Sequence, residues 1–143
     1  MRMSVRLVVL VAIVAVPSIV VVPSMVEARQ QQKRPSAEVQ AYLEYRKEVA
    51  RAKQLEDLYY YLDRQTGEFY RSLSGPERAK ILQQLKAQVD LFPQVQVVKE
   101  DRMATSVMLT IEATSADNAT KAAVTVEILR EGASLKVGPS TWK

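Results

Sequence analysis

The chain has 143 residues and a formal net charge of +4, and it contains neither cysteine nor histidine. The lack of cysteine excludes disulfide bonds and thiolate nucleophiles, and the lack of histidine excludes Ser-His-Asp triads and nearly all zinc sites. Because the excess of basic residues is small, we do not expect nucleic-acid binding.

The first 28 residues predict a signal peptide. Arg2 and Arg6 precede an apolar run over residues 7–16, and small residues up to Ala28 suit cleavage by a signal peptidase. The alternative is an uncleaved anchor, because residues 7–26 approach the ~20 apolar residues that span a bilayer. Two prolines interrupt that stretch and favour cleavage, since each removes a helix hydrogen-bond donor. We therefore expect a periplasmic or secreted protein, which is bound to the membrane only if the signal is uncleaved.

Residues 29–35 predict a flexible tether, because they lack apolar periodicity, and residues 36–143 predict one folded domain. The domain opens with a helical pattern in which Ser36 can act as the cap. One long helix to residue 64 fits the pattern, and so does a break near residues 51–54. Residues 65–67 are expected to end it at Gly67. The expected buried stripe is Val39, Tyr42, Leu43, Val49 and Ala50, followed by Leu55, Leu58, Tyr59 and Leu62.

A further helix is predicted to begin at residues 74–77, where Pro76 suits the first turn and Glu77 suits the positive end of the helix dipole. Pro93 is expected to end this helix after Phe92. Its expected buried stripe is Ile81, Leu82, Leu85 and Val89.

After Pro93 the apolar period changes to two, which indicates half-buried strands. The predicted strands lie around residues 95–97, 107–113, 124–128 and 135–142, and the predicted turns lie at residues 100–102, 115–118 and 130–132. Such spacing favours an antiparallel meander. Because helices precede strands, we predict an α+β fold in which N-terminal helices cover one face of a curved antiparallel sheet.

Four segments carry a resemblance to a known family: Tyr61-Leu62, residues 73–82, Val98-Lys99-Glu100 and the closing hairpin over residues 124–143. Together they resemble an exported bacterial family of unknown function in the nuclear transport factor 2-like, or SnoaL-like, cone superfamily. The resemblance implies a strongly bent sheet whose hollow is closed by the helices and often contains a cavity. Leu135 replaces a tryptophan that is usual in the hairpin, and the turn at residues 100–102 lacks the usual Gly-Asp, so the pocket rim is expected to differ.

Tyr59 and Trp142 are the candidate ligand contacts. Tyr59 belongs to a run of three tyrosines, and consecutive helical residues point about 100° apart, so the three cannot face one ligand. We interpret Tyr59 first as a core residue with its hydroxyl at the edge. Trp142 is interpreted first as a plug at the end of the last strand, because a large aromatic ring contributes mainly to packing.

No catalytic residue, metal site or cofactor is predicted. Glu112 and Glu127 are the acids inside the predicted strands, and both alternate out of phase with the apolar residues, which places them on the outer face of the sheet. Asp57 and Asp63 flank the tyrosines and are interpreted as solvated. We expect the hollow of the sheet to have no proton-transfer groups, that is, no ionisable side chain beside an aromatic hydroxyl.

These features predict a non-catalytic envelope domain that binds a small apolar ligand or docks to an envelope protein. The alternatives are an isomerase-like or dehydratase-like enzyme of the cone fold and a membrane-anchored accessory subunit. The outer face of the sheet is only moderately polar, so it suits either exposure to solvent or pairing with a second copy in a homodimer. Its predicted members include Met108, Thr110, Thr125 and Leu129.

Overall fold

The computed structural model describes residues 34–143. The predicted signal peptide, residues 1–28, lies outside the described residues, as do residues 29–33 of the predicted tether. Arg34 and Pro35 are exposed and precede the first described helix. In this part of the chain, no helix is both long enough and apolar enough to cross a membrane.

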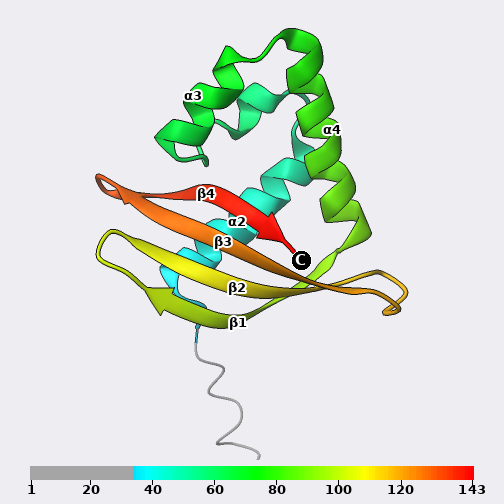
Figure 1. The fold of residues 1–143 in the computed structure, drawn as a ribbon, viewed down its shortest axis with the longest axis vertical. Helices are drawn as coiled ribbons and strands as arrows, with labels where there is room; N and C mark the ends of the chain where they lie inside the picture. The colour runs from blue at the N-terminus through cyan, green and yellow to red at the C-terminus, as the bar shows by residue number, and fades with distance from the viewer. Residues whose placement is uncertain (1–33) are drawn as a thin grey trace, which may run out of the picture. The chain divides into compact units, whose positions relative to one another are not determined.

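Helices come first along the described chain and strands follow, which confirms the predicted α+β class (Figure 1). The helical elements are α2 (Ala37–Arg51), the short 3-10 helix η1 (Leu55–Leu58), α3 (Arg64–Ser72) and α4 (Gly75–Leu91). The strands are β1 (Gln94–Arg102), β2 (Ser106–Thr114), β3 (Lys121–Glu131) and β4 (Ser134–Trp142).

The strands form an antiparallel sheet in the order β1-β2-β3-β4, so the predicted meander is confirmed. Ile111 of β2 lies opposite Val124 of β3, and Leu109 lies opposite Val126. Because side chains alternate along a strand, these apolar residues share one face of the sheet. The sheet is not closed, since β1 and β4 form its two edges.

The predicted turn at residues 100–102 is wrong, because these residues are the end of β1. A bulge between Val97 and Lys99 shifts the register, and the charged residues after it continue to pair with β2. The turn falls at residues 103–105, where the Met103 N–H donates to the Ser106 carbonyl over 2.9 Å. The turn expected at residues 130–132 is displaced in the same direction, because β3 continues to Glu131.

The first helix ends at Arg51, so the predicted break near residues 51–54 is confirmed and the single long helix is wrong. Ser36 caps α2, because its hydroxyl accepts a hydrogen bond of 3.2 Å from the Val39 N–H. The carboxylate of Asp57 accepts hydrogen bonds from the N–H groups of Lys53 and Gln54, at 2.8 and 3.2 Å. These bonds stabilise the start of η1 in place of a further turn of α2.

The prediction that Gly67 ends a helix is wrong, because Gly67 lies inside α3. The carboxylate of Asp63 accepts a hydrogen bond of 3.1 Å from the Thr66 N–H, which begins a helix just before the expected terminator. The predicted start of α4 is confirmed: Ser74 and Glu77 form a reciprocal capping box, with 2.8 Å between the Ser74 nitrogen and a Glu77 carboxylate oxygen. α4 ends at Leu91, close to the predicted stop at Pro93.

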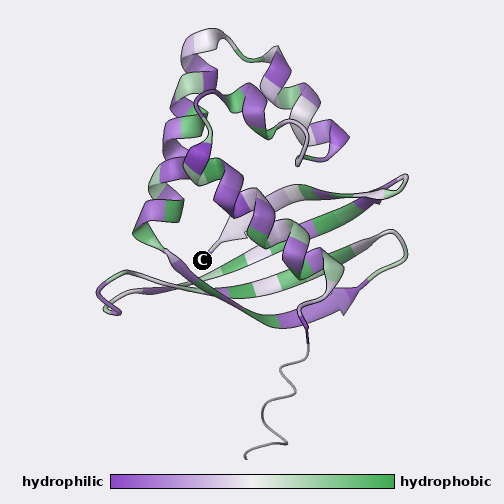
Figure 2. Ribbon diagram, turned by 180° about the vertical axis from the view of Figure 1, so that it is seen from behind, coloured by the Kyte–Doolittle hydropathy of each residue, from purple (hydrophilic) through white to green (hydrophobic). Residues whose placement is uncertain are grey.

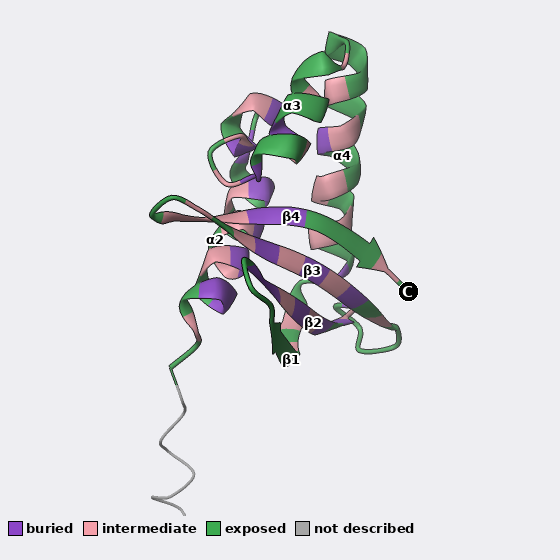
Figure 3. Cartoon of the chain, turned by 60° about the vertical axis from the view of Figure 1, so that its left-hand side comes forward, coloured by how far each residue is buried: buried purple, intermediate pink, exposed green. Residues whose placement is uncertain are grey.

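Two clusters of buried side chains form the core. The first joins α2 to the helix-facing side of the sheet and contains Val39, Tyr42, Leu109, Ile111, Val124, Val126, Ile128 and Val137 among others. The second joins α2, η1 and α4 and contains Val49, Ala52, Leu55, Leu58, Leu62 and Leu82. Hydropathy alternates along the strands in Figure 2, and Figure 3 shows buried positions along β2 and β3 and in the middle of β4. Ile81, Leu85 and Val89 of the predicted α4 stripe are only partly buried.

Candidate functional site

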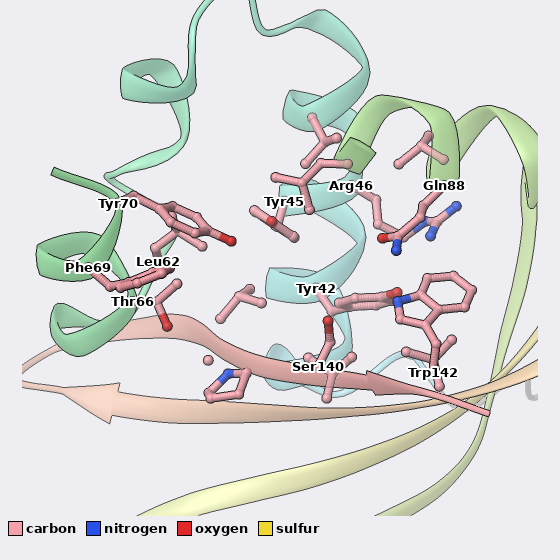
Figure 4. Close-up of a pocket in the computed structure, with 18 of the residues that line it drawn as sticks. Tyr42, Tyr45, Arg46, Leu62, Thr66, Phe69, Tyr70, Gln88, Ser140 and Trp142 are labelled. Carbon is pink, nitrogen blue, oxygen red and sulfur yellow. The ribbon is translucent and has the colours of Figure 1, made fainter. Parts of the chain in front are cut away.

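A cavity of about 420 Å³ lies between α2, α3, α4 and the helix-facing side of β3 and β4 (Figure 4). Its volume falls in the range of about 300–1,000 Å³ that is common for small-molecule sites. Aromatic side chains make up much of the wall: Tyr42, Tyr45, Phe69, Tyr70 and Trp142. Most other lining residues are apolar, and Arg46 and Gln88 are two of the polar exceptions.

The periodicity of α2 places its cavity residues. Tyr42, Arg46 and Val49 follow at steps of four and three, so they occupy one face of the helix, and all three are buried. That face lies against the sheet, where Val124 and Val126 of β3 point into the same cavity. The prediction that Ala50 is buried is wrong, because the face of α2 that packs passes through Val49, and Ala50 is exposed.

Residues 61–63 hold α3 beside the edge of the sheet. The Val137 N–H donates to the Tyr61 carbonyl over 2.7 Å, and the Asp63 N–H donates to the Val137 carbonyl over 2.9 Å. Leu62 therefore pairs with β4 as a short parallel extension of the sheet. Asp63 then caps α3, so the cap and the sheet contact together place Phe69 and Tyr70 over the cavity.

Arg46 is the cationic residue of the cavity wall. It is 8% exposed, and its guanidinium donates a hydrogen bond of 2.6 Å to the Phe92 carbonyl. Its guanidinium carbon lies 6.0 Å from the centre of the Tyr42 ring. Among residues 34–143, Arg46 forms no ion pair, and no Asp or Glu lines this cavity. The cavity therefore contains a buried positive charge that no carboxylate of the described chain neutralises.

This arrangement contradicts the expectation that no ionisable side chain lies beside an aromatic hydroxyl in the hollow. Arg46 lies next to Tyr42, and the sequence analysis missed it. A signal was present, because Arg46 stands between Tyr42 and Val49 at helical spacing in the middle of the predicted apolar stripe. An arginine at such a position has to be buried or to bend out of the core. Arginine stays protonated in proteins, so the group supplies a fixed charge instead of a proton-transfer site.

The cavity tyrosines keep their protons at neutral pH. Burial raises the pKa of Tyr42, and the neighbouring Arg46 partly offsets that rise. Burial also raises the pKa of Tyr45, with smaller contributions from Tyr70 and Tyr42. The pKa of Tyr70 is raised by burial and by the charge of Asp63. Each phenol is therefore a neutral group that can donate a hydrogen bond into the cavity.

The two predicted contact residues lie in different places. Trp142 is partly buried at the end of β4, lines the cavity and packs against Phe92 with 5.4 Å between ring centres. Tyr59 does not line it and instead packs in the second core cluster, with the Arg71 guanidinium 4.8 Å from its ring centre. The expectation that the Tyr59 hydroxyl lies at the edge is wrong, because this oxygen is buried and has no hydrogen-bond partner among the described residues.

The carboxylates lie away from the cavity. Glu112 is exposed. Glu127 is half-buried, and its carboxylate accepts a hydrogen bond of 2.7 Å from the Ser106 hydroxyl. Asp57 caps η1 at the surface, but the prediction that Asp63 is solvated is wrong: it is 4% exposed because it caps α3 next to β4. Across residues 34–143, no group of three or more Asp and Glu side chains is arranged to hold a metal ion.

Comparison with protein-family models gives no match for this chain. Comparisons with curated proteins and with solved structures also give none. The fold class therefore rests on the structure described above, and the likeness to the nuclear transport factor 2-like superfamily stays a prediction from sequence.

Proposed function

We propose that this protein is an exported, non-catalytic domain of the bacterial cell envelope that binds a small molecule between its helices and its sheet. The observation that carries the proposal is the cavity of about 420 Å³ with its aromatic wall.

We also propose that the fold is a variant of the nuclear transport factor 2-like cone. The antiparallel meander with helices before it supports that likeness, and the open sheet is the point at which it departs from a closed cone.

The cavity chemistry supports binding over the isomerase-like or dehydratase-like alternative. Those reactions need a base or an acid that exchanges a proton near neutral pH. The ionisable groups that line this cavity are arginine and tyrosine, and burial raises the pKa of Tyr42, Tyr45 and Tyr70 from the ordinary value of a phenol. These groups can donate hydrogen bonds to a ligand, but they are poorly suited to abstract a proton from it.

The experiment is a titration with N-phenyl-naphthylamine, a neutral fluorophore whose emission rises in apolar surroundings. Ser140 lines the cavity and is exposed, so Ser140→Trp places a large ring in part of the cavity with little disturbance of the core. Thr141→Trp is the matched control, because Thr141 is the next residue on the same strand, is also exposed and lies outside the cavity lining. We expect saturable binding to the wild type and to Thr141→Trp, and much weaker binding to Ser140→Trp. Equal binding to all three would refute the proposed site.

A homodimer through the outer face of the sheet is a second proposal. Thr110 pairs with Thr125 near the centre of this face, and Met108 and Leu129 lie on the same side. All four side chains are partly exposed and uncharged, which suits association with a second copy. Light scattering of the purified protein is expected to give the mass of a dimer, and Thr125→Arg is expected to give that of a monomer. A monomeric wild type would exclude this proposal.

A further inference from the structure

The positive charge inside the cavity indicates what kind of small molecule fits it. We infer that the ligand is an amphipathic carboxylate whose anionic head contacts Arg46 and whose apolar body lies along the aromatic wall. This inference rests on the proposed binding function and adds the chemical class of the ligand. Its basis is one side chain, its surroundings and the extent of the apolar space beside it.

Arg46 is built into the cavity as a receptor for an anion. The side chain is more than nine-tenths buried, and burial of an unpaired charge is unfavourable unless a partner neutralises it. The hydrogen bond to the Phe92 carbonyl uses one of the five N–H groups of the guanidinium, and a neutral carbonyl does not neutralise the charge. The planar guanidinium matches a carboxylate, which can accept two parallel hydrogen bonds from it.

The neighbours of Arg46 are donors and not competing anions. Figure 4 shows the side chains of Arg46 and Gln88 at one end of the cavity, near the rings of Tyr42 and Trp142. The amide of Gln88 and the protonated hydroxyl of Tyr42 can each donate a hydrogen bond. Because no Asp or Glu of the described chain lines this space, a ligand carboxylate would meet donors and a positive charge together.

The opposite end of the cavity is uncharged and largely apolar or aromatic, which suits a hydrocarbon or aromatic body. Leu62, Phe69 and Tyr70 lie there with Thr66, and Val137 of β4 pairs with Leu62. The Thr66 hydroxyl already donates to Asp63, and Arg46 at the other end is the only charged side chain among the described residues that line the cavity, so the charge is separated from this end. At about 30 Å³ for each water-sized group, the volume of about 420 Å³ has room for roughly a dozen such groups. A carboxylate with a short acyl chain or a single aromatic ring fits this space.

The test compares acids with neutral analogues of the same shape. Octanoate with octanol and phenylpropanoate with phenylpropanol are titrated by calorimetry into the purified protein at neutral pH. The fluorescence of Trp142, the single tryptophan of the chain, reports on the same cavity. We expect at least one acid to bind about tenfold more tightly than its alcohol, which is the effect of one charge-assisted contact. Arg46→Gln is expected to remove this preference.

Arg51→Gln is the matched control, because Arg51 lies on the same helix, has a side chain that is 75% exposed and does not line this cavity. It is expected to keep the preference for the acid. If Arg46→Gln fails to fold, Arg46→Lys takes its place, with a reduced preference expected because lysine cannot form the paired hydrogen bonds. An unchanged preference in the Arg46 variant that folds would overturn the inference.

The remaining outcomes separate the inference from the proposed function. Equal affinity of the acids and the alcohols for the wild type overturns the role of Arg46 and leaves a binding cavity in place. Failure of the acids to bind, while the neutral fluorophore still binds, also overturns the inference alone. If neither the four small molecules nor the fluorophore bind, the proposed function fails as well.

Discussion

The guanidinium of Arg46 and the carbonyl of Phe92 lie 2.6 Å apart and join the middle of α2 to the junction between α4 and β1. Phe92 is itself 8% exposed and packs against Trp142 at the end of the last strand. These two contacts thus connect three distant parts of the chain at one end of the cavity. The hydrogen bond to Phe92 also holds Arg46, the only cation among the described residues that line the cavity, in a single position.

The first prediction concerns the effect of Arg46 on stability. Arg46→Met removes a buried charge that has no carboxylate partner, which favours the folded state, and it also removes the hydrogen bond to Phe92, which opposes this gain. Replacement of buried charges by apolar residues is often neutral or stabilising, so we expect the free energy of unfolding to rise by about 1 kcal/mol in the absence of ligand. Urea denaturation measures it. A fall of more than about 1 kcal/mol would indicate that Arg46 is retained for structure.

The second prediction tests the core that α2, η1 and α4 share. Leu58 is fully buried in that cluster, so Leu58→Ala is expected to lower the free energy of unfolding by about 2–5 kcal/mol through lost burial and the space left behind. Leu91 is 58% exposed, and Leu91→Ala is expected to change the free energy of unfolding by less than about 0.5 kcal/mol. Thermal and urea denaturation compare the two variants. Similar losses in both would contradict the assigned core.

The third prediction concerns the cap of α3. Asp63→Ala removes the side chain that accepts from the Thr66 N–H, and it is expected to cost about 0.5–2 kcal/mol of stability. Because α3 places Phe69 and Tyr70 over the cavity, ligand binding is expected to weaken as well. Asp63→Asn keeps a capping oxygen, so its loss of stability is expected to be much smaller. Hydrogen exchange of the α3 amides distinguishes the variants, and equal exchange in α3 of the alanine variant and the wild type would rule out this role.

The fourth prediction is a loss of stability at alkaline pH. Burial raises the pKa of Tyr42, Tyr45 and Tyr70 in the folded state above the value of about 10 in the unfolded chain. The folded state therefore retains protons that the unfolded state releases, so the contribution to stability is fully present below about pH 10 and is lost as the pH rises through the folded-state pKa values. Denaturation at increasing pH measures this loss of stability, and tyrosinate absorbance reports the ionisation of the tyrosines. Tyr45→Phe is expected to reduce the alkaline loss, and an undiminished loss in that variant would contradict the assignment.

The fifth prediction concerns the predicted signal peptide, which lies outside the described residues. If residues 1–28 are cleaved during export, mass spectrometry of the natural protein will find Arg29 as the first residue. A mature protein that still begins at Met1 would favour the membrane-anchored alternative.

Local patterns in the sequence predicted much of the fold. The strands follow from the strict alternation in residues 107–113 and 124–128, and the start of α4 follows from Ser74 and Glu77, whose capping box needs only neighbouring residues. The end of β1 was missed because a bulge at Val97 and Lys99 allows charged residues to continue an edge strand.

The cavity was harder to predict, because it depends on contacts between distant segments. Gly67 was predicted to end a helix, but Asp63, which the sheet contact with Val137 holds in place, caps a new helix that begins at Arg64 and includes Gly67. Trp142 was predicted to be a weak ligand contact, and it lines the cavity, while Tyr59 does not. Arg46 was missed because a cation in an apolar stripe is usually solvated, and only the packing of α2 against the sheet shows that this one is buried.

The central claim is that a small molecule occupies the cavity between the helices and the sheet. Amide chemical shifts of the isotope-labelled protein, followed during titration with octanoate, test it most directly. We expect saturable shifts concentrated at the cavity residues Arg46, Phe69, Val137 and Trp142. Shifts confined to the outer face of the sheet around Thr110 and Thr125, or no saturable shifts with octanoate or with the neutral fluorophore, would contradict the account.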